Sequence, residues 1–359
     1  MNAPVKAPIG RSRINEMKNS LSSGEGNSVQ KPSVWRSIVA DRQKLQTIVT
    51  LLVLLLMIIV FSFFNPRFLT LSNFQNLARN TAPLIIAASA MTAVMIARGL
   101  DLSVGSVLAA CSVVAASLAV KGVPLPLAFL GALAFGALIG FLNGAIIVRM
   151  RVSPIIVTLG SLNIARGIAY LITPSAILVG LPPNWSAIGT AKLGPFPMPI
   201  LIAAVVALVY GWASQRTKFG KHVYAVGGNE EAARLSGVPV ERTLISLYVL
   251  SGMMAALAGI VLSSRVGSGD PNIGVGFELE VIAAVIIGGT SLSGGEGRIM
   301  GTVIGAIIVG VLSNGLNLSG VEPFWQYVAQ GLVLIAAVVV DKRVNERVLR
   351  IARRHPRPA

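Results

Sequence analysis

Polar side chains that could bind a solute are few in this chain, and five of them lie within two long apolar segments. They are Asn143, Thr158, Ser161, Asn163 and Arg166. A charge inside a membrane is costly and usually faces a helix-bundle interior or water. Asn163 and Arg166 are three residues apart and share one helix face. We take the five as candidates for lining a translocation path for a polyhydroxylated solute, with hydrogen bonds between neighbouring helices as the alternative role.

No grouping of residues predicts an enzyme. The segment LSGGE at 292–296 resembles the signature sequence of ABC-type ATPases, but those proteins also need a phosphate-binding loop, G-x-x-x-x-G-K-S/T. The only Gly-Lys pair, Gly220-Lys221, is followed by His222 and lacks the earlier glycine. Cys111 is the only cysteine and there are two histidines, so a metal site built from these ligands is not expected. We therefore predict no catalytic residues, no bound metal and no ATP hydrolysis by this chain itself.

Asp101 follows Arg98 where the second apolar segment gives way to the third. We expect a local ion pair between these two residues rather than a proton relay. No succession of Asp, Glu or His residues crosses the apolar segments, although proton- and sodium-coupled transporters commonly use such residues. The sequence therefore disfavours ion-coupled transport.

The most polar stretch between apolar segments contains a short predicted helix. Its residues are Asn229, Glu230, Glu231, Ala232, Ala233, Arg234, Leu235, Ser236 and Gly237. Asn229 is a favourable N-cap, the two glutamates place negative charge at the positive helix end, and Gly237 suits the position after the last turn. A helix of about two turns is marginal alone because nucleation is costly. It must pack against another surface, either its own membrane body or a cytoplasmic partner.

These residues belong to a strongly apolar chain. Of 359 residues, 54% are hydrophobic and 12% charged, and the mean hydropathy is +0.75; soluble domains carry about a quarter charged residues. A membrane-spanning helix needs about 20 apolar residues. Ten runs are candidates, the eighth being short: 45–64, 82–97, 103–120, 125–148, 155–173, 197–213, 244–263, 281–291, 299–316 and 324–340. We predict an all-α integral membrane protein with about ten transmembrane helices.

The domain organisation follows from these runs. Residues 45–340 form the transmembrane domain, between a basic tail at 1–44, expected to be flexible, and a basic tail at 341–359. Small residues recur at four-residue spacing, as at Gly136 and Gly140, which indicates close helix packing or a packed wall around a path.

The distribution of basic residues predicts the orientation. With ten crossings and a cytoplasmic N-terminus, 24 of the 30 Lys and Arg residues fall on the cytoplasmic side and five on the other. Such an excess marks the cytoplasmic side of membrane proteins. Both termini are therefore expected in the cytoplasm, with 174–196 outside and 214–243 inside. The basic tails favour contact with anionic membrane lipid, and because no RNA- or DNA-binding module is visible, no nucleic-acid partner is expected.

Five segments, read in order, resemble the permease subunit of ribose/xylose/arabinose-type ABC sugar importers, in the branched-chain amino acid/sugar ABC permease superfamily. They are GLDLSVGS at 99–106, PIIVTLG at 154–160, IARG at 164–167, GGNEEAARLSG at 227–237 and GGTSLSGG at 288–295. The resemblance covers roughly Asn73 to Asp341 and leaves out the two tails. Members of that family often have Gly-Gly before the Ile/Leu-Asp-Leu-Ser run, whereas Ala97-Arg98-Gly99 stands here.

The resemblance implies a type II ABC importer-like permease in the bacterial inner membrane, with ten-helix subunits forming a homodimer around a central path. Two cytoplasmic ABC ATPase subunits use ATP and Mg, a periplasmic sugar-binding protein delivers the solute, and this chain holds no cofactor. The resemblance assigns 229–237 as the coupling helix that docks into the ATPase. It also implies an inverted repeat that relates helices two to five to helices seven to ten. We therefore expect import of a monosaccharide or related polyol by alternating access.

Three other functions stay open. They are an ion-coupled secondary transporter, an ABC permease for branched-chain amino acids, and a membrane scaffold that transports nothing. Transport by an ion-coupled transporter would depend on ions, whereas transport by an ATP-driven importer would be sensitive to vanadate. A scaffold would show no solute flux in proteoliposomes.

Overall fold

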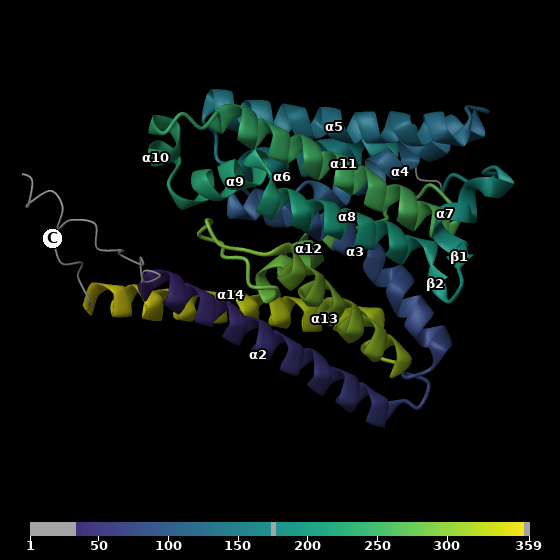
Figure 1. Cartoon of the computed structure of the whole chain (residues 1–359). Helices are drawn as coiled ribbons and strands as arrows, with labels where there is room; N and C mark the ends of the chain where they lie inside the picture. The colour runs from purple at the N-terminus through teal and green to yellow at the C-terminus, as the bar shows by residue number, and fades with distance from the viewer. Residues whose placement is uncertain (1–33, 174–176, 355–359) are drawn as a thin grey trace, which may run out of the picture. The chain divides into compact units, whose positions relative to one another are not determined.

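The protein is built almost entirely of α-helices (Figure 1). The computed structural model describes residues 34–173 and 177–354, and the contacts divide the chain into Met1–Leu45 and Gln46–Ala359. The helices are α2 (Val34–Phe64), α3 (Leu71–Ile96), α4 (Val104–Val120), α5 (Leu125–Met150), α6 (Pro154–Ile172), α8 (Met198–Arg216), α9 (Lys218–Gly228), α10 (Glu230–Leu235), α11 (Val240–Val266), α12 (Phe277–Ile287), α13 (Ile299–Leu318) and α14 (Pro323–Arg354). Between α6 and α8 lie η1 (Pro183–Ser186), α7 (Ala187–Thr190) and an antiparallel pair, β1 (Lys192–Leu193) with β2 (Phe196–Pro197).

Seven of the described helices are long and apolar enough to cross a membrane: α2 from Thr47, α3, α5, α6, α8, α11 and α13. Two further apolar stretches, α4 and residues 324–339 of α14, are shorter. α12 has 11 residues. At ~1.5 Å per residue it covers about 16 Å, roughly half of a ~30 Å hydrocarbon core. The eighth run is therefore a short helix, as its sequence indicates, and the total of ten crossings stays a prediction.

Helix α3 begins earlier than the hydropathy pattern predicts. The apolar run starts at Ala82, but Thr70 caps the helix, its side chain accepting a hydrogen bond from the N–H of Asn73 at 3.3 Å. Polar residues in the first turns hide this part of the helix from a hydropathy pattern. Asn73 is nevertheless buried, and its amide exchanges hydrogen bonds of 3.0 and 2.9 Å with Asn314 of α13. The polar end of α3 is thus supported by another helix.

The first and last helices also differ from the predicted boundaries. α2 begins at Val34 and α14 continues to Arg354, so both run into the segments predicted as tails. Residues 1–33 and 355–359 of those tails, and 174–176 of the predicted outer connection, lie outside the described residues.

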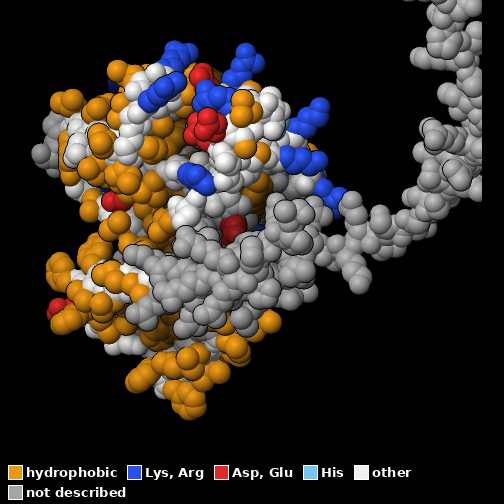
Figure 2. Space-filling view, turned by 90° about the vertical axis from the view of Figure 1, so that its left-hand side faces the viewer, with side chains coloured by type: hydrophobic (Ala, Val, Ile, Leu, Met, Phe, Trp, Pro, Cys, Tyr) orange, Lys and Arg blue, Asp and Glu red, His pale blue; other side chains and the backbone are white. Residues whose placement is uncertain are grey.

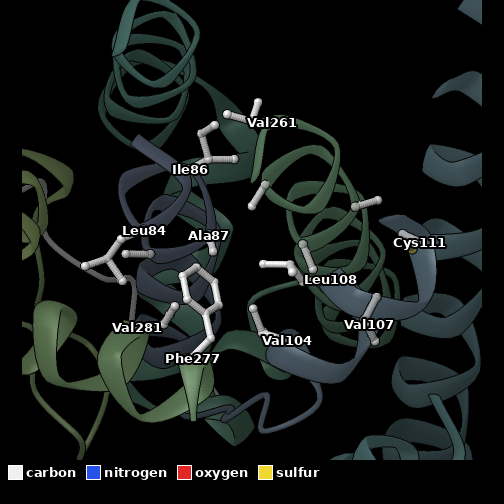
Figure 3. Close-up of a cluster of buried hydrophobic side chains, with 14 of the residues drawn as sticks. Leu84, Ile86, Ala87, Val104, Val107, Leu108, Cys111, Val261, Phe277 and Val281 are labelled. Carbon is white, nitrogen blue, oxygen red and sulfur yellow. The ribbon is translucent and has the colours of Figure 1, made fainter. Parts of the chain in front are cut away.

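Helix α3 lies among α8, α11, α12 and α13, and its side chains enter a shared apolar core (Figure 3). Ile86 and Ala87 of α3, Leu108 of α4 and Val261 of α11 are all buried there, together with Phe277 of α12. Lipid tails are as apolar as these side chains, so close packing rather than transfer from water holds such helices together.

Glycines make the closest helix contacts. A Cβ atom at Gly140 of α5 would collide with the carbonyl oxygen of Tyr248 in α11, and one at Gly136 with that of Gly252. Gly305 of α13 meets the backbone of α12 in the same way. The small-residue spacing therefore lets helix backbones touch.

Gly140→Ala is expected to destabilise the purified protein by about 1–3 kcal/mol, because an added methyl group forces two packed backbones apart. The matched control is Gly211→Ala in α8, where the nearest atom to an added Cβ is 4.0 Å away. There alanine should be neutral or stabilising. Thermal unfolding of the detergent-solubilised protein measures both, and a wild-type midpoint for Gly140→Ala would contradict the close contact.

Candidate functional site

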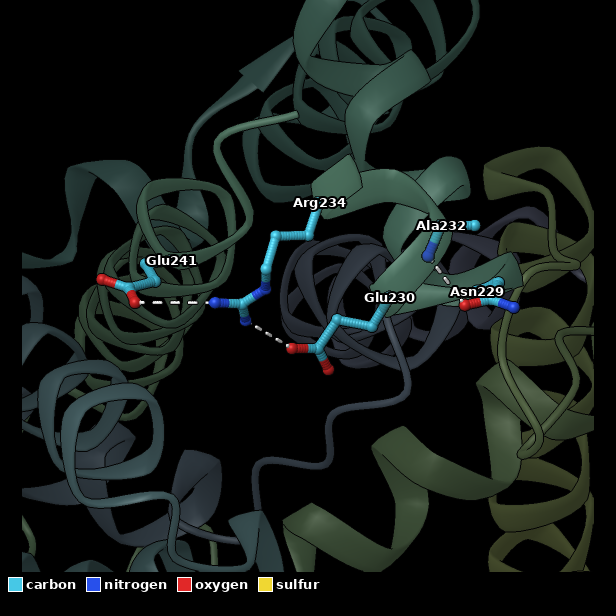
Figure 4. Close-up of polar contacts among 5 residues, drawn as sticks. All are labelled: Asn229, Glu230, Ala232, Arg234 and Glu241. Atoms are coloured by element: carbon cyan, nitrogen blue, oxygen red, sulfur yellow. Dashed lines mark hydrogen bonds and ion pairs between the residues drawn. The ribbon is translucent and has the colours of Figure 1, made fainter. Parts of the chain in front are cut away.

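Residues 229–237 form the short helix that their sequence predicts. Asn229 is the N-cap of α10, and its Oδ1 accepts a hydrogen bond from the N–H of Ala232 at 3.0 Å (Figure 4). Glu230 and Glu231 occupy the first turn, where negative charge interacts favourably with the helix dipole. Gly237 has a φ of +79°, the left-handed conformation that ends a helix. The predicted helix and its caps are confirmed, and its docking role stays a prediction.

Helix α10 rests on its own membrane body with one face and leaves the other exposed. Ala233 is 5% exposed and packs in a cluster with Val226 and Val240. Leu235, two residues later, is 85% exposed. The sequence predicts that this helix packs either against its own membrane body or against a cytoplasmic partner, and the structure shows contact with the membrane body. The face that carries Leu235 is accessible to a partner.

The unit has one end that carries α9 and α10, opposite β1 and β2 (Figure 1). Figure 2 shows Lys and Arg side chains gathered there, with acidic side chains among them and hydrophobic ones over the flanks. On α10, Arg234 donates to Glu230 at 3.0 Å and lies 4.0 Å from Glu241 (Figure 4). These side chains are half exposed or more, so the pairs add little stability.

Arg98 joins the end of α3 to the residues just before α10. Its Nε donates to the carbonyl oxygen of Gly227 at 2.7 Å, and its Nη2 to that of Gly228 at 2.8 Å. The expected ion pair with Asp101 is therefore wrong. The reason is the backbone at Arg98, whose φ of +64° turns the chain between the two residues, so that their side chains find different partners.

Asp101 is buried at the centre of a polar cluster formed by Asp101, Ser103, Asn143, Ser161 and Ser251. Its Oδ1 accepts from the N–H and the hydroxyl of Ser103 at 3.0 and 2.5 Å, and its Oδ2 from the hydroxyl of Ser251 in α11 at 2.7 Å. The amide of Asn143 in α5 donates to Ser103 Oγ at 3.2 Å, and Asn143 Oδ1 accepts from Ser161 in α6. The polar cluster therefore links the connection between α3 and α4 to three further helices.

Two of the five predicted path residues, Asn143 and Ser161, come together in the polar cluster. Thr158 is fully buried, and its hydroxyl donates at 2.8 Å to a carbonyl one turn earlier in α6. Asn163 is exposed, and its amide donates at 3.2 Å to another α6 carbonyl. These two side chains mainly bond within their own helix, the first buried and the second on the outer face.

The fifth path candidate, Arg166, turns away from Asn163. Its Nη1 donates to the carbonyl oxygens of Pro271 and Ile273, in the connection between α11 and α12. A guanidinium inside a membrane protein needs such acceptors, because an unpaired charge there is costly. Asn163 and Arg166 share a helix, but the structure does not bring their side chains into one site.

Sequence reasoning missed Ser103 and Ser251. The signal for Ser103 is its place two residues after Asp101, since an Asp side chain commonly accepts from the N–H two residues on. Ser251 carries no local signal, because it reaches Asp101 only through the packing of α11.

Asp101→Ala is expected to destabilise the protein by several kcal/mol. Two hydroxyl groups and one N–H would lose their acceptor in a buried site, and each such loss costs about 1–3 kcal/mol. Ser251→Ala removes one donor and should cost only about 1 kcal/mol. Thermal unfolding in detergent compares the two variants, and equal small losses would show that Asp101 does not organise the polar cluster.

Comparison with known proteins places these features in a family. The family described as "Branched-chain amino acid transport system / permease component" matches residues 73–338. The ribose import permease protein of Escherichia coli (strain K12) is 41% identical over 298 residues, which cover 82% of this chain and 93% of the relative. That of Bacillus subtilis (strain 168) is 41% identical over 293 residues, with 81% and 91% covered.

A third relative is named for a different sugar. The D-allose transport system permease protein of Escherichia coli (strain K12) is 35% identical over 300 residues, with 83% of this chain and 92% of the relative covered. These matches confirm the resemblance to sugar-importer permeases. They also agree with the expectation that this chain is a permease component and not itself an enzyme. The chain belongs to the branched-chain amino acid transport system / permease component family, and the relatives named above are permeases for ribose and D-allose.

Proposed function

We propose that this chain is the membrane-spanning permease subunit of an ATP-driven ABC importer in the bacterial inner membrane. It moves a monosaccharide or related polyol into the cytoplasm by alternating access. The observation that carries the proposal is α10, a capped helix that buries Ala233 and presents Leu235 outward. The ribose and D-allose permeases among its relatives favour a sugar over a branched-chain amino acid.

In this proposal α10 is the coupling helix that docks into a cytoplasmic ABC ATPase. The ATPase subunits use ATP and Mg, a periplasmic sugar-binding protein delivers the solute, and this chain holds no cofactor. Movement of α10 reaches the end of α3 through Arg98, which holds the carbonyl oxygens of Gly227 and Gly228. Three residues further on, Asp101 passes the movement to α5, α6 and α11 through the polar cluster. Coupling of this kind needs a contiguous set of contacts with two arrangements.

We assign the homodimer contact and the translocation path to the exposed face of α6. Gly160, Asn163 and Gly167 recur at three- and four-residue spacing, and no atom lies within 4 Å of a Cβ added at either glycine. A second subunit could approach closely here, and the amide of Asn163 could bind a solute hydroxyl. Another face of α6 is held by the hydrogen bond between Ser161 and Asn143 of α5. Thr158 and Arg166 hold α6 through hydrogen bonds to the carbonyl oxygens of Leu100 and Ile273.

We also propose ten crossings and an inverted repeat that relates α3–α6 to α11–α14. Several pairs of residues are separated by the same number of positions in the sequence. They are Leu71 and Val240, Asp101 and Asp270, Gly105 and Gly274, and Pro154 and Pro323. The two residues of the first pair are the first residues of α3 and α11, and the two residues of the last pair are the first residues of α6 and α14.

Local geometry supports the repeat. Asp101 Oδ1 accepts from the N–H two residues on at 3.0 Å, and Asp270 Oδ1 does the same at 2.8 Å. The packing corresponds as well, since α11 contacts α4 and α5 while α3 contacts α12 and α13. Gly105 and Gly274 lie against each other, because a Cβ at Gly274 would sit 3.0 Å from the Gly105 carbonyl oxygen. Corresponding residues meet in this way beside a two-fold axis.

The proposed orientation predicts the labelling of single cysteines in a Cys111→Ala background. Lys192→Cys, in β1, should react with a membrane-impermeant maleimide added outside intact cells. Lys218→Cys, at the start of α9, should react only after the membrane is opened. Both lysines are exposed, so the protein itself protects neither position. The reverse pattern would overturn the orientation and place α10 outside the cell.

Leu235→Asp should weaken copurification of the partner ATPase at least about tenfold, the ratio given by ~1.4 kcal/mol. The change places a charge in a contact that excludes water, while an exposed side chain contributes little to the fold. Ala233 is unsuitable for this test, because it is buried against the permease itself.

The matched control is Leu193→Asp in β1, which is 67% exposed at the opposite end of the unit. It should reach the membrane and retain the ATPase. Full retention of ATPase by Leu235→Asp, together with wild-type uptake, would contradict the coupling assignment.

A further inference from the structure

A polar cavity of about 250 Å³ lies between α3, α12, α13 and α14, separate from the polar cluster and from α10. Its lining includes Asn80, Glu280, Ser313, Asn317, Gln326 and Gln330. Liquid water takes up about 30 Å³ per molecule, so the cavity holds the equivalent of about eight waters. A single monosaccharide is of this size class, and a disaccharide exceeds it.

The lining combines side chains that hydrogen bonds hold in place with one, Asn317, that faces the cavity. Gln330 Nε2 donates to Glu280 at 3.0 Å and to Ser313 at 3.2 Å, which fixes the amide in the cavity wall. Asn317 is exposed, and the structure gives its side chain no hydrogen bond within the described part of the chain. Polar side chains among membrane helices are costly and commonly mark solute pathways. Amide and carboxylate groups suit a ligand whose hydroxyls both donate and accept.

The charge of the lining narrows the class of solute. Glu280 is the one charged residue among the described residues that line the cavity, and no Lys, Arg or His accompanies it. A carboxylate or phosphate on the solute would meet the acidic group of Glu280 with no cation in the lining to balance it, and the guanidinium of Arg265 outside the lining already donates to Asn80 Oδ1. The lining therefore favours a neutral hydroxylated solute over an amino acid or a sugar phosphate.

The position of the cavity relates it to the polar cluster. Under the constant interval of the proposed repeat, Gln330 of α14 corresponds to Ser161 of α6. Both side chains are hydrogen-bonded, but Ser161 lies in the closed polar cluster, whereas Gln330 lines the cavity. The cavity also lies toward the end of α3 where Gln75 donates to the carbonyl of Pro195, away from Arg98 at the other end. In the proposed orientation this is the outer side.

We infer that this cavity is a solute-binding site on the outer side of each subunit, which accepts one neutral polyhydroxylated solute of monosaccharide size before it enters the path. The inference rests on the proposed function and orientation. It adds a site within the subunit, apart from the face of α6 that we assign to the path.

The test is protection of a single cysteine in the assembled importer. Asn317→Cys is introduced into a Cys111→Ala background, and labelling by an impermeant maleimide is timed with and without the sugar that the background protein transports, chosen among D-ribose, D-allose and L-arabinose. Asn317 is exposed, and its side chain has no hydrogen bond among the residues that the structure describes, so the change breaks none of those. At about ten times the dissociation constant, occupancy should slow labelling about tenfold.

Three controls separate the outcomes. Asn184→Cys, exposed in η1 and outside the cavity lining, should label at one rate with or without sugar. Sucrose at equal concentration should not protect Asn317→Cys, and neither should L-leucine. If a sugar that the background protein imports leaves the maleimide labelling rate of Asn317→Cys unchanged, the site is overturned and the proposed function still stands. Protection by L-leucine alone would overturn the solute class, and failure to import any of the sugars would contradict the proposed function and this inference together.

Discussion

The approach of α5 to α11 at Gly136, Gly140 and Gly252 is the contact on which the rest of the arrangement depends. Backbone touches backbone there, and no side chain larger than hydrogen fits between the helices. The contact sets Asn143 of α5 against Ser103 and brings Ser251 of α11 to Asp101. A buried carboxylate requires donors of this kind, because burial without them is costly. The glycines therefore decide whether the polar cluster forms, and the polar cluster fixes the connection from which Arg98 reaches toward α10.

Much of the fold and part of the site follow from local sequence. The caps of α10, its length and the long apolar helices are readable because each depends on neighbouring residues. The partners of Arg98 and Asp101 are not, because a left-handed backbone residue and a serine on a distant helix decide them. The early start of α3 is hidden by polar residues whose partners lie far along the chain, on α13 and in the turn between β1 and β2. The proposed repeat pairs DLSVG at 101–105 with DPNIG at 270–274, but two identical residues in five carry little weight without the geometry.

The two polar regions differ in a way that bears on transport. The polar cluster is closed, with its side chains bonded to one another, and lies where α3 ends near α9 and α10. The cavity between α3, α12, α13 and α14 is open and lies toward the other end of α3. Under the proposals above, this arrangement is closed toward the cytoplasm and open toward the outside. Docking of an ATPase on α10 would then act on the closed region first, since Arg98, three residues before Asp101, bonds the carbonyl oxygens of Gly227 and Gly228 just before α10.

ATP-driven sugar uptake by the purified complex tests this account most directly. The permease is reconstituted into proteoliposomes with the proposed ATPase and sugar-binding protein, and radiolabelled ribose, allose or arabinose is followed with time. The account predicts uptake that requires ATP and the binding protein, is abolished by vanadate, and persists when proton and sodium gradients are collapsed. Uptake that continues with vanadate and disappears with the ion gradients would contradict it and identify a secondary transporter.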